Sequence, residues 1–201
     1  IFHHSLDIDN QGNIYVPIRF KSYYSDNAIY KDEGFAILDK DLKIIKVFSL
    51  TKIFQDSGLG YRIFSTNIKD PFHLNDLAPL KNDKSTNTVF LSLRSQSSIV
   101  ALDIDKSKIK WLAEGFFNRQ HDVDILDEEG TQLSVFDNNV RDGVNSLGNK
   151  FIIIKNLPSN DFNNEIRTNI FSYPNKISLN KMIDIEEENF KSLFKNNLLP
   201  K

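Results

Sequence analysis

The sequence contains no cysteine and no long apolar run, and its charge is nearly balanced. The absence of cysteine excludes disulfide bonds, thiolate metal sites and a cysteine nucleophile. No apolar stretch approaches the roughly 20 residues that a membrane-spanning helix needs. We therefore expect no membrane span. With 25 basic and 27 acidic residues the net charge is −2, so we also expect no nucleic-acid partner held by bulk positive charge.

The residues that are present are typical of a folded domain. The 201 residues are 40% apolar and include 16 Phe and 6 Tyr, which argues against disorder. The chain begins at Ile1 inside a patterned segment and ends at Lys201 without the signs of a finished terminus. We therefore expect a fragment of a longer protein, in which any signal peptide would lie upstream.

One pattern, His-x-x-Asp-aliphatic, occurs three times, at residues 4–8, 73–77 and 121–125. Each copy is followed by a turn signal and then by a short apolar run that ends in a polar residue. The runs occupy residues 14–19, 89–94 and 133–138. A pattern that recurs in this way indicates that one structural unit is repeated along the chain.

The unit continues with two strands joined by an Asp/Lys-rich turn, at residues 35–47 and again at 99–111. Four short strands in about 50 residues match a β-propeller blade. We therefore predict an all-β fold, a partial β-propeller with about three four-stranded blades. Because propellers have roughly four to eight blades, the remaining blades would lie outside this chain. Residues 1–201 would form a single propeller fragment, with blade-like units at about 1–50, 70–115 and 118–185.

Some segments depart from this simple pattern. Pro17 lies inside an expected strand and counts against a central position for it. A short helix is expected near residues 50–55, and the apolar spacing of residues 185–197 is compatible with another helix. Further strands are expected at 149–156 and 169–173, around a polar insertion at 157–167.

Three of the four histidines fall at the same phase of the repeat. Because the first strand of each propeller blade lines the central channel, His4, His73 and His121 would converge near its mouth. His3 adjoins His4 but is out of phase. The alternative is a scaffold role, in which a His and an Asp brace each blade, as in WD-type propellers. We expect the Asp of each repeat to be structural, capping a turn or bracing the blade.

The polar ends of the apolar runs carry a separate signal. Arg94 ends a run in which an unpaired arginine would be expensive to bury. Its polar neighbours Ser92, Ser95 and Gln96 predict a pocket in which the guanidinium binds an oxyanion such as sulfate, phosphate or carboxylate. Arg19 is expected to emerge into solvent at its strand end.

These segments together resemble the PAPS-independent arylsulfotransferase family, over most of residues 1–145. The resemblance rests on His4 in its His-His context, His73-Leu-Asn75, Ser92-Leu-Arg94-Ser-Gln96, and Gln120-His121 followed by Ser134-Val-Phe-Asp-Asn138. It implies a six-bladed propeller with its active site in the central channel. Members of this family move a sulfuryl group from a phenolic sulfate ester to another phenol through a sulfohistidine intermediate. They use no nucleotide sulfate donor, and we expect no cofactor.

The resemblance also implies roles for individual residues. His121 matches the histidine that becomes sulfated, and His4 matches an upstream active-site histidine. His73 and Asn75 match the His-x-Asn pair, and Arg94 matches the arginine that follows it. Arg94 and Asn75 would then hydrogen-bond the sulfuryl oxygens, while His73 or His4 would exchange a proton with the phenols.

Asp122 departs from the pattern, because it places a carboxylate directly after His121. Such a carboxylate would repel a sulfate ester. Adjacent residues of a strand face opposite sides, so this side chain can point away from the site.

Other classes of function stay open. Three converging histidines could hold Zn, Cu or Fe, although the neighbouring Arg94 cation disfavours a metal. The propeller could also bind a ligand or partner without catalysis. A pyrroloquinoline-quinone-type propeller enzyme is disfavoured, because Trp111 is the single tryptophan. The resemblance implies an aryl sulfate donor and a phenolic acceptor as partners and a periplasmic or otherwise exported location, with a homo-oligomer left open.

Overall fold

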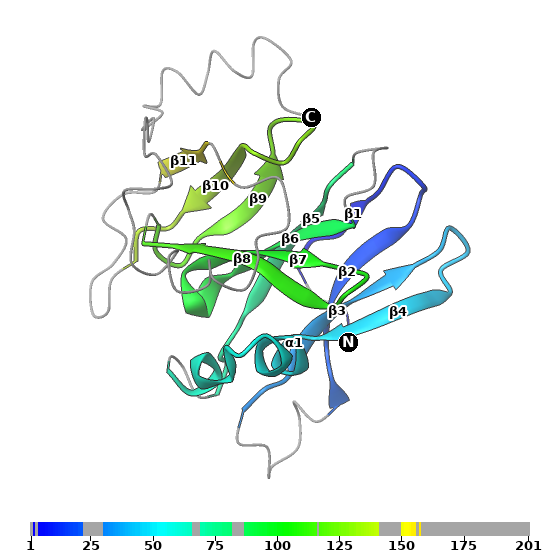
Figure 1. The fold of residues 1–201 in the computed structure, drawn as a ribbon, viewed down its shortest axis with the longest axis horizontal. Helices are drawn as coiled ribbons and strands as arrows, with labels where there is room; N and C mark the ends of the chain where they lie inside the picture. The colour runs from blue at the N-terminus through cyan, green and yellow to red at the C-terminus, as the bar shows by residue number, and fades with distance from the viewer. Residues whose placement is uncertain are drawn as a thin grey trace.

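The protein is described here by a computed structural model that covers residues 2, 4–21, 30–65, 69–81, 87–115, 117–140, 150–155 and 157. It forms three antiparallel sheets in which each strand pairs with its neighbours along the chain (Figure 1). The first sheet holds β1 (Asp7–Ile8), β2 (Ile14–Arg19), β3 (Glu33–Leu38) and β4 (Ile44–Ser49). The second holds β5 (Leu74–Pro79), β6 (Thr88–Leu93), β7 (Ser98–Asp103) and β8 (Lys108–Glu114). The third holds β9 (His121–Ile125), β10 (Leu133–Asp137) and β11 (Lys150–Ile154).

The first strands of the three sheets lie next to one another. β1 contacts β5, and β5 contacts β9, so one strand from each sheet contributes to a shared inner row. In Figure 1 the third sheet lies beyond the second, on the side away from the first. The predicted all-β fold is confirmed, and the sheets have the meander form of propeller blades. The strands described here do not close a ring.

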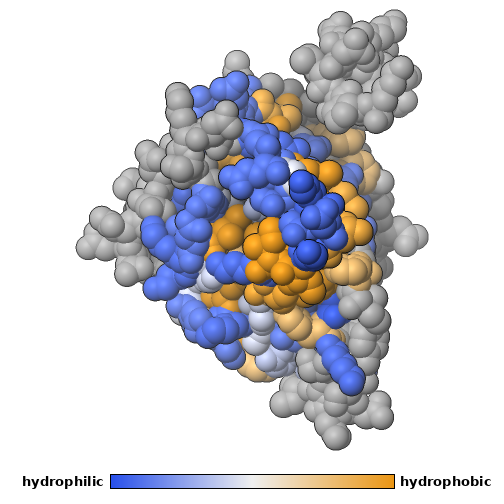
Figure 2. Space-filling view, turned by 90° about the vertical axis from the view of Figure 1, so that its right-hand side faces the viewer, coloured by the Kyte–Doolittle hydropathy of each residue, from blue (hydrophilic) through white to orange (hydrophobic). Residues whose placement is uncertain are grey.

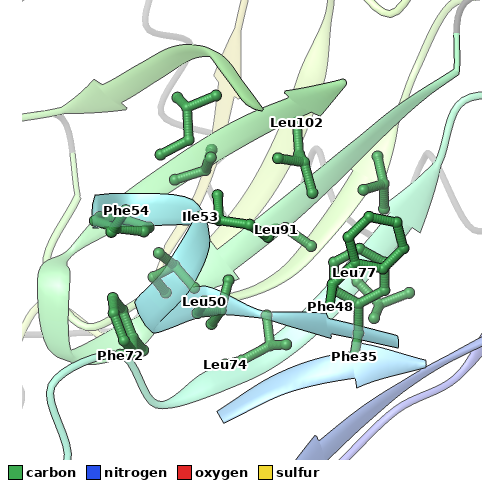
Figure 3. Close-up of a cluster of buried hydrophobic side chains, with 14 of the residues drawn as sticks. Phe35, Phe48, Leu50, Ile53, Phe54, Phe72, Leu74, Leu77, Leu91 and Leu102 are labelled. Carbon is green, nitrogen blue, oxygen red and sulfur yellow. The ribbon is translucent and has the colours of Figure 1, made fainter. Parts of the chain in front are cut away.

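Two apolar clusters hold the sheets together. Between the first and second sheets, Phe35 and Phe48 stack with ring centroids 4.4 Å apart, in a cluster with Leu77, Leu91 and Leu102 (Figure 3). Between the second and third sheets, buried side chains of β6, β8, β9 and β10 form a second cluster. Each fully buried side chain of this size contributes about 1.5–3 kcal/mol. The second sheet is therefore apolar on both faces, which explains why β6 is buried at every position.

The short helix expected near residues 50–55 is confirmed as α1 (Leu50–Asp56). Ser49 caps it, because its side-chain oxygen accepts a hydrogen bond from the Lys52 backbone at 3.2 Å. The helix buries Ile53 and Phe54 in the first cluster. The 3-10 turn η2 (Gly60–Phe64) follows and leads to the segment before β5.

The outer face of the first sheet is also apolar. The register aligns Val16 with Ala36 and Val47, so these three side chains share a face. Val47 is partly exposed, as are Ile44 and Ile45 on the same strand. Figure 2 views the molecule from this side and shows apolar surface ringed by hydrophilic residues. Among the described residues no sheet covers this face, and a further sheet could pack on it.

Pro17 was expected to count against a central position for its strand, but the strand that contains it, β2, is not at the edge of its sheet. β2 lies between β1 and β3, and Pro17 pairs with Phe35 of β3. On the other side, β1 pairs only with Ile14 and Tyr15. Phe2 forms an isolated bridge with Ile18, so Pro17 lies between two pairings on this side and is itself in neither.

The sheet registers refine the repeat. In the first and third sheets, the aliphatic residue of the repeat pairs with the first residue of the next strand, as in Ile8 with Ile14 and Ile125 with Leu133. In the second sheet, Leu77 pairs with Leu91 instead, three residues after the first residue of β6. Its first hairpin is therefore longer than the sequence alignment implied.

Several expectations fall partly or wholly outside the described residues. The strand expected at 149–156 is confirmed as β11. His3, most of the 157–167 insertion, the strand at 169–173 and the helix at 185–197 lie outside them, as does much of the unit placed at 118–185. Within the described part, no helix is long and apolar enough to cross a membrane.

Candidate functional site

The three repeat histidines lie at the same end of the inner strands. His4 precedes β1, His73 directly precedes β5, and His121 begins β9. The backbone φ is 60° at His4 and 49° at His73, in the left-handed region that non-glycine residues rarely adopt. Such a conformation costs about 1–3 kcal/mol and persists only where surrounding contacts impose it, which is common at functional sites.

His4 and His73 come into direct contact. Their ring centroids are 5.3 Å apart, with the ring planes inclined by 57°. Burial lowers the pKa of His4 below its ordinary value of 6.5, and the positive charges of His73, Arg19 and His121 lower it further. These groups therefore lie within electrostatic reach of one another, and the His4 ring is neutral near pH 7.

His73 is fixed by a carboxylate that the sequence analysis did not single out. Its Nδ1 lies 2.7 Å from Oδ2 of Asp70, and both side chains are largely buried. The His73 carbonyl accepts a hydrogen bond from the Arg94 backbone at 3.1 Å, and the Leu74 backbone donates to Glu33 Oε2 at 2.8 Å. Contacts on both sides therefore impose the unusual backbone of this histidine.

His121 is held through one ring nitrogen. The side-chain amide nitrogen of Asn138 lies 2.7 Å from its Nδ1 and also donates to the Arg119 carbonyl at 2.6 Å. In this orientation the amide donates to Nδ1 as well, so the neutral ring carries its proton on Nε2. Burial lowers the pKa of His121, and the Arg94 cation lowers it further. The ring also makes a hydrogen bond with the Arg119 backbone, which acts to raise its pKa, and no side chain among the described residues is hydrogen-bonded to Nε2.

Arg94 begins a 3-10 turn, η3 (Arg94–Gln96), and lies near His73 and His121. Its backbone donates to His73, as described, and Ser95 donates to the Phe72 carbonyl at 3.1 Å. The guanidinium lies close enough to His121 to lower its pKa. Within the described part of the chain it makes no hydrogen bond or ion pair, so its donors are available to an anion.

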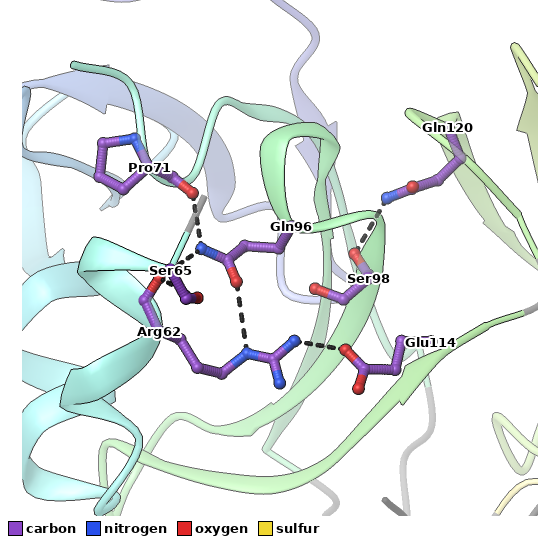
Figure 4. Close-up of polar contacts among 7 residues, drawn as sticks. All are labelled: Arg62, Ser65, Pro71, Gln96, Ser98, Glu114 and Gln120. Atoms are coloured by element: carbon purple, nitrogen blue, oxygen red, sulfur yellow. Dashed lines mark hydrogen bonds and ion pairs between the residues drawn. The ribbon is translucent and has the colours of Figure 1, made fainter. Parts of the chain in front are cut away.

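A polar network behind the site holds η3 in place (Figure 4). The Gln96 side chain donates to the Pro71 carbonyl at 2.7 Å and to the Arg62 carbonyl at 3.1 Å. The Arg62 guanidinium in turn pairs with Glu114 of β8. η2, η3, β8 and the segment before His73 are thereby joined, and the expected polar pocket is in part this structural network.

Asn75 lies beside the site rather than in it. It is buried, and its amide nitrogen donates to the Gln120 carbonyl at 2.7 Å. The Gln120 side chain donates to Ser92 at 3.2 Å and to the Ser98 carbonyl at 2.9 Å. The residue that precedes His121 is therefore anchored to β5, β6 and β7. Asn75 Oδ1 is buried and has no partner among the described residues.

Asp122 occupies a β-bulge. His121 pairs with Phe136 and Val123 with Val135, which leaves Asp122 as the extra residue, with a φ of 51°. Its side chain is exposed, but its charge still acts to raise the pKa of His121. The simple alternation expected for this strand therefore fails at Asp122.

Arg19 corrects one expectation. It does not emerge into solvent: its side chain is 23% exposed, and its Nε donates to Oε1 of the fully buried Glu33 at 3.0 Å. No sequence pattern indicated this pair, since the two residues lie on neighbouring strands and are 14 positions apart in the chain. Glu33 also binds the backbone of Leu74, so Arg19 supports the site through it.

The expectation that the repeat aspartates are structural is supported at Asp76. Its carboxylate accepts hydrogen bonds from the Val123 backbone at 2.7 Å and from the Ser5 hydroxyl. It therefore links the segment before β1, β5 and β9. His73 is bound to Asp70 and not to the Asp of its own repeat, so the WD-type brace is absent from the described contacts of this histidine.

The described residues contain no group of three His, Asp or Glu side chains placed to share a metal ion. The histidines approach one another but are not arranged as a common ligand set. An arginine with free donors beside them suits an anion better than a cation. The arrangement thus combines neutral His121, whose Nε2 has no side-chain partner among the described residues, with the Arg94 cation and with His73, which is bound to a carboxylate.

A family model described as Arylsulfotransferase (ASST) matches residues 1–185, which include all the site residues described above. No curated protein matches the chain. The match covers nearly all of the 201 residues.

Proposed function

Because the chain belongs to the arylsulfotransferase family, and its function is of the aryl sulfotransfer type, we propose that it moves a sulfuryl group from a phenolic sulfate ester to a phenolic acceptor. The group would pass through a covalent intermediate on His121. The observation that carries this proposal is the meeting of His4, His73 and His121 beside an arginine with free donors.

His121 is suited to be the nucleophile. Its lowered pKa keeps the ring neutral near pH 7, and Nε2 is the nitrogen without a side-chain partner in the described residues. Attack requires the lone pair on Nε2 and therefore the ring proton on Nδ1. Rotation of the Asn138 amide would then present its oxygen to Nδ1–H, in exchange for the hydrogen bond that its nitrogen donates to the Arg119 carbonyl.

The first half-reaction forms one bond and breaks one. Nε2 of His121 bonds to sulfur while the bond from sulfur to the phenolic oxygen breaks, and its electron pair leaves with that oxygen. The phenolate takes a proton from a protonated imidazole, His73 or His4, and departs as the phenol. The sulfohistidine keeps its Nδ1 proton, which makes the ring a good leaving group.

The second half-reaction is the reverse with a new phenol. The acceptor hydroxyl gives its proton to the imidazole that acted as acid, and its oxygen bonds to sulfur as the bond from sulfur to nitrogen breaks. Two separate half-reactions predict ping-pong kinetics.

Arg94 would stabilise the charge on the sulfuryl oxygens in both steps. Sulfuryl transfer resembles phosphoryl transfer, in which catalysis consists mainly of positioning and electrostatic stabilisation. Asn75 is better suited to hold Gln120, and through it the His121 backbone, than to contact the sulfuryl group. We therefore assign it a positioning role.

The test is to trap the intermediate in the full-length protein. With a radiolabelled aryl sulfate and no acceptor, the wild-type protein should acquire one acid-labile sulfate. His121→Asn should abolish the label, whereas the control Asp39→Asn, in the hairpin between β3 and β4, should retain it. Persistent label in His121→Asn would refute the nucleophile assignment.

A second candidate, binding of an aryl sulfate without turnover, is favoured by one observation. Asp122 places a negative charge near His121, which opposes the approach of a sulfate ester. Binding of 4-nitrophenyl sulfate with neither label nor release of 4-nitrophenol would support this candidate. In that case Asp122→Asn should tighten binding.

We also propose, from the family, that the protein works in the periplasm or another exported compartment. Fractionation of cells that express the full-length protein would test this location. Recovery in the cytoplasmic fraction would contradict it.

A further inference from the structure

We propose that Asp70 positions His73 so that His73, and not His4, exchanges the proton with the departing and incoming phenols. This inference rests on the proposed sulfuryl transfer and assigns a task that the transfer itself leaves open between two histidines. Asp70 lies outside all three repeat segments.

The geometry of the pair is specific. Asp70 Oδ2 lies 2.7 Å from His73 Nδ1, and the side chains are 17% and 22% exposed. A carboxylate only accepts hydrogen bonds, so Nδ1 of His73 carries a proton. The other ring nitrogen, Nε2, is therefore the one that can give or take a proton on the opposite edge of the ring.

Asp70 is an ionised partner. Burial acts to raise its pKa, but the hydrogen bond and charge of His73, together with Lys31 and Arg19, outweigh burial and lower it. Its Oδ1 is buried and has no hydrogen-bond partner among the described residues. The carboxylate therefore directs its described hydrogen bonding to His73 alone.

The backbone of the pair is immobilised from neighbouring elements. Gln96 holds the Pro71 carbonyl, Arg94 holds the His73 carbonyl, and Glu33 holds the Leu74 N–H. These contacts impose the positive φ of His73. Non-glycine residues adopt this left-handed conformation rarely, and it persists where surrounding contacts impose it.

The contact between His4 and His73 limits how much positive charge the two rings can carry together. Two imidazoles with centroids 5.3 Å apart cannot both be protonated cheaply, because like charges repel. The pKa of His4 is lowered by burial and by neighbouring cations. The Asp70 carboxylate contacts His73 directly at 2.7 Å, so a positive charge that develops on the His73 ring is compensated by an adjacent negative charge.

The ionisable groups that interact with His73 are His4, Asp70 and His121. Arg19 and Lys31 act in turn on Asp70, and Arg94 and Asp122 act on His121.

The proton path balances in both directions. In the first half-reaction protonated His73 gives its Nε2 proton to the phenolic oxygen as the bond to sulfur breaks, and the ring becomes neutral. In the second, neutral His73 takes the proton of the acceptor hydroxyl at Nε2. Asp70 remains a carboxylate throughout and keeps Nδ1 protonated.

The first experiment compares donors with good and poor leaving groups in the full-length protein. 4-Nitrophenolate leaves without much help from an acid, whereas unsubstituted phenolate needs it. Asp70→Asn keeps an oxygen acceptor for Nδ1–H but removes the charge. We expect it to lower the rate about 10²-fold with phenyl sulfate but less than about fivefold with 4-nitrophenyl sulfate. His4→Gln should lower the two rates equally.

His73→Gln provides the matched comparison. If Asp70 acts through His73, the double variant Asp70→Asn/His73→Gln should be no slower with phenyl sulfate than His73→Gln alone. The control Asp39→Asn should react like the wild-type protein with both donors. Equal losses with both donors in Asp70→Asn, or additive losses in the double variant, would overturn the proposal.

A spectroscopic measurement tests the pair without turnover. In ¹⁵N NMR the neutral His73 ring should show a protonated Nδ1 in the wild-type protein, and Asp70→Ala should lose this preference. A wild-type protein that shows this tautomer but transfers no sulfuryl group would defeat the proposed function, and the proton-exchange role with it. A wild-type protein that transfers the group while His73 is protonated on Nε2 would defeat the Asp70 assignment alone.

Discussion

The Asp76 carboxylate accepts a hydrogen bond from the Val123 backbone N–H at 2.7 Å, and this contact joins β5 to β9 across two sheets. The Ser5 hydroxyl donates to the same carboxylate. Burial raises the pKa of Asp76 to about 6. A carboxylate that connects the inner strands is thus held at a cost when it is ionised.

This cost predicts an unusual dependence of stability on pH. Asp76 holds its proton more tightly in the folded than in the unfolded protein, so protonation of Asp76 adds to the free energy of unfolding. This contribution is full below pH 3.8 and is lost as the pH rises through about 6. The loss between acid and neutral pH amounts to about 3 kcal/mol. Asp76→Asn keeps an acceptor for Val123 and carries no charge, so it should be more stable than the wild-type protein above pH 6.

Urea denaturation near the two ends of this pH range would measure the effect. The wild-type protein and Asp39→Asn should share the Asp76 contribution, whereas Asp76→Asn should lack it. If the wild-type protein and Asp76→Asn differ by the same amount at both pH values, the assignment is wrong.

Arg94→Ala should lower kcat by about 10²-fold or more, because it removes the donors that stabilise the sulfuryl oxygens. Arg94→Lys should recover only part of this loss, since an ammonium lacks the planar fork of a guanidinium. The backbone contact of Arg94 with His73 is retained in both variants, so thermal stability should change little. An unchanged kcat in Arg94→Ala would remove Arg94 from the site.

The acid limb of kcat/KM should lie below pH 6.5. The nucleophile acts when neutral, and burial together with the Arg94 charge lowers the pKa of His121. In Arg94→Ala the limb should move upward and still lie below 6.5, because burial is the larger cause. Rates with 4-nitrophenyl sulfate across the acid range would locate it. A wild-type limb above 6.5 contradicts the prediction.

Asn138→Ala should slow transfer about tenfold, the equivalent of one hydrogen bond of about 1–1.5 kcal/mol. Asn138→Asp offers a carboxylate to Nδ1–H of His121, so it should be faster than Asn138→Ala and should raise the acid limb. Because Asn138 also binds the Arg119 carbonyl, thermal denaturation of both variants serves as the control. If the two variants are equally slow and equally stable, Asn138 does not act through Nδ1.

The sequence allowed the strands to be predicted because their apolar runs are short and bounded by turn residues. It also placed the histidines in one phase, and the inner strands β1, β5 and β9 carry them at a common end. Asp39, whose carboxylate caps the backbone of Asp41 and Lys43 at 2.9 Å, illustrates a turn that local composition determines.

The remaining features depend on contacts between distant segments. Arg19 pairs with Glu33 only because the antiparallel register of β2 and β3 places the two residues opposite each other. Asp70 lies in a linking segment that no repeat includes, and Asn75 turns toward Gln120 because the strand is bulged there. None of these contacts leaves a periodic trace, so pattern alone could not reveal them.

The bulges at Asn75 and Asp122 separate the rim of the inner strands from their interior. Beyond each extra residue the in–out alternation starts afresh. The side chains at the rim, which would contact the sulfate donor or the phenolic acceptor, therefore need not follow the in–out alternation of the packed strands below them. Substrate preference could diversify at that rim while the hydrophobic layers remain the same.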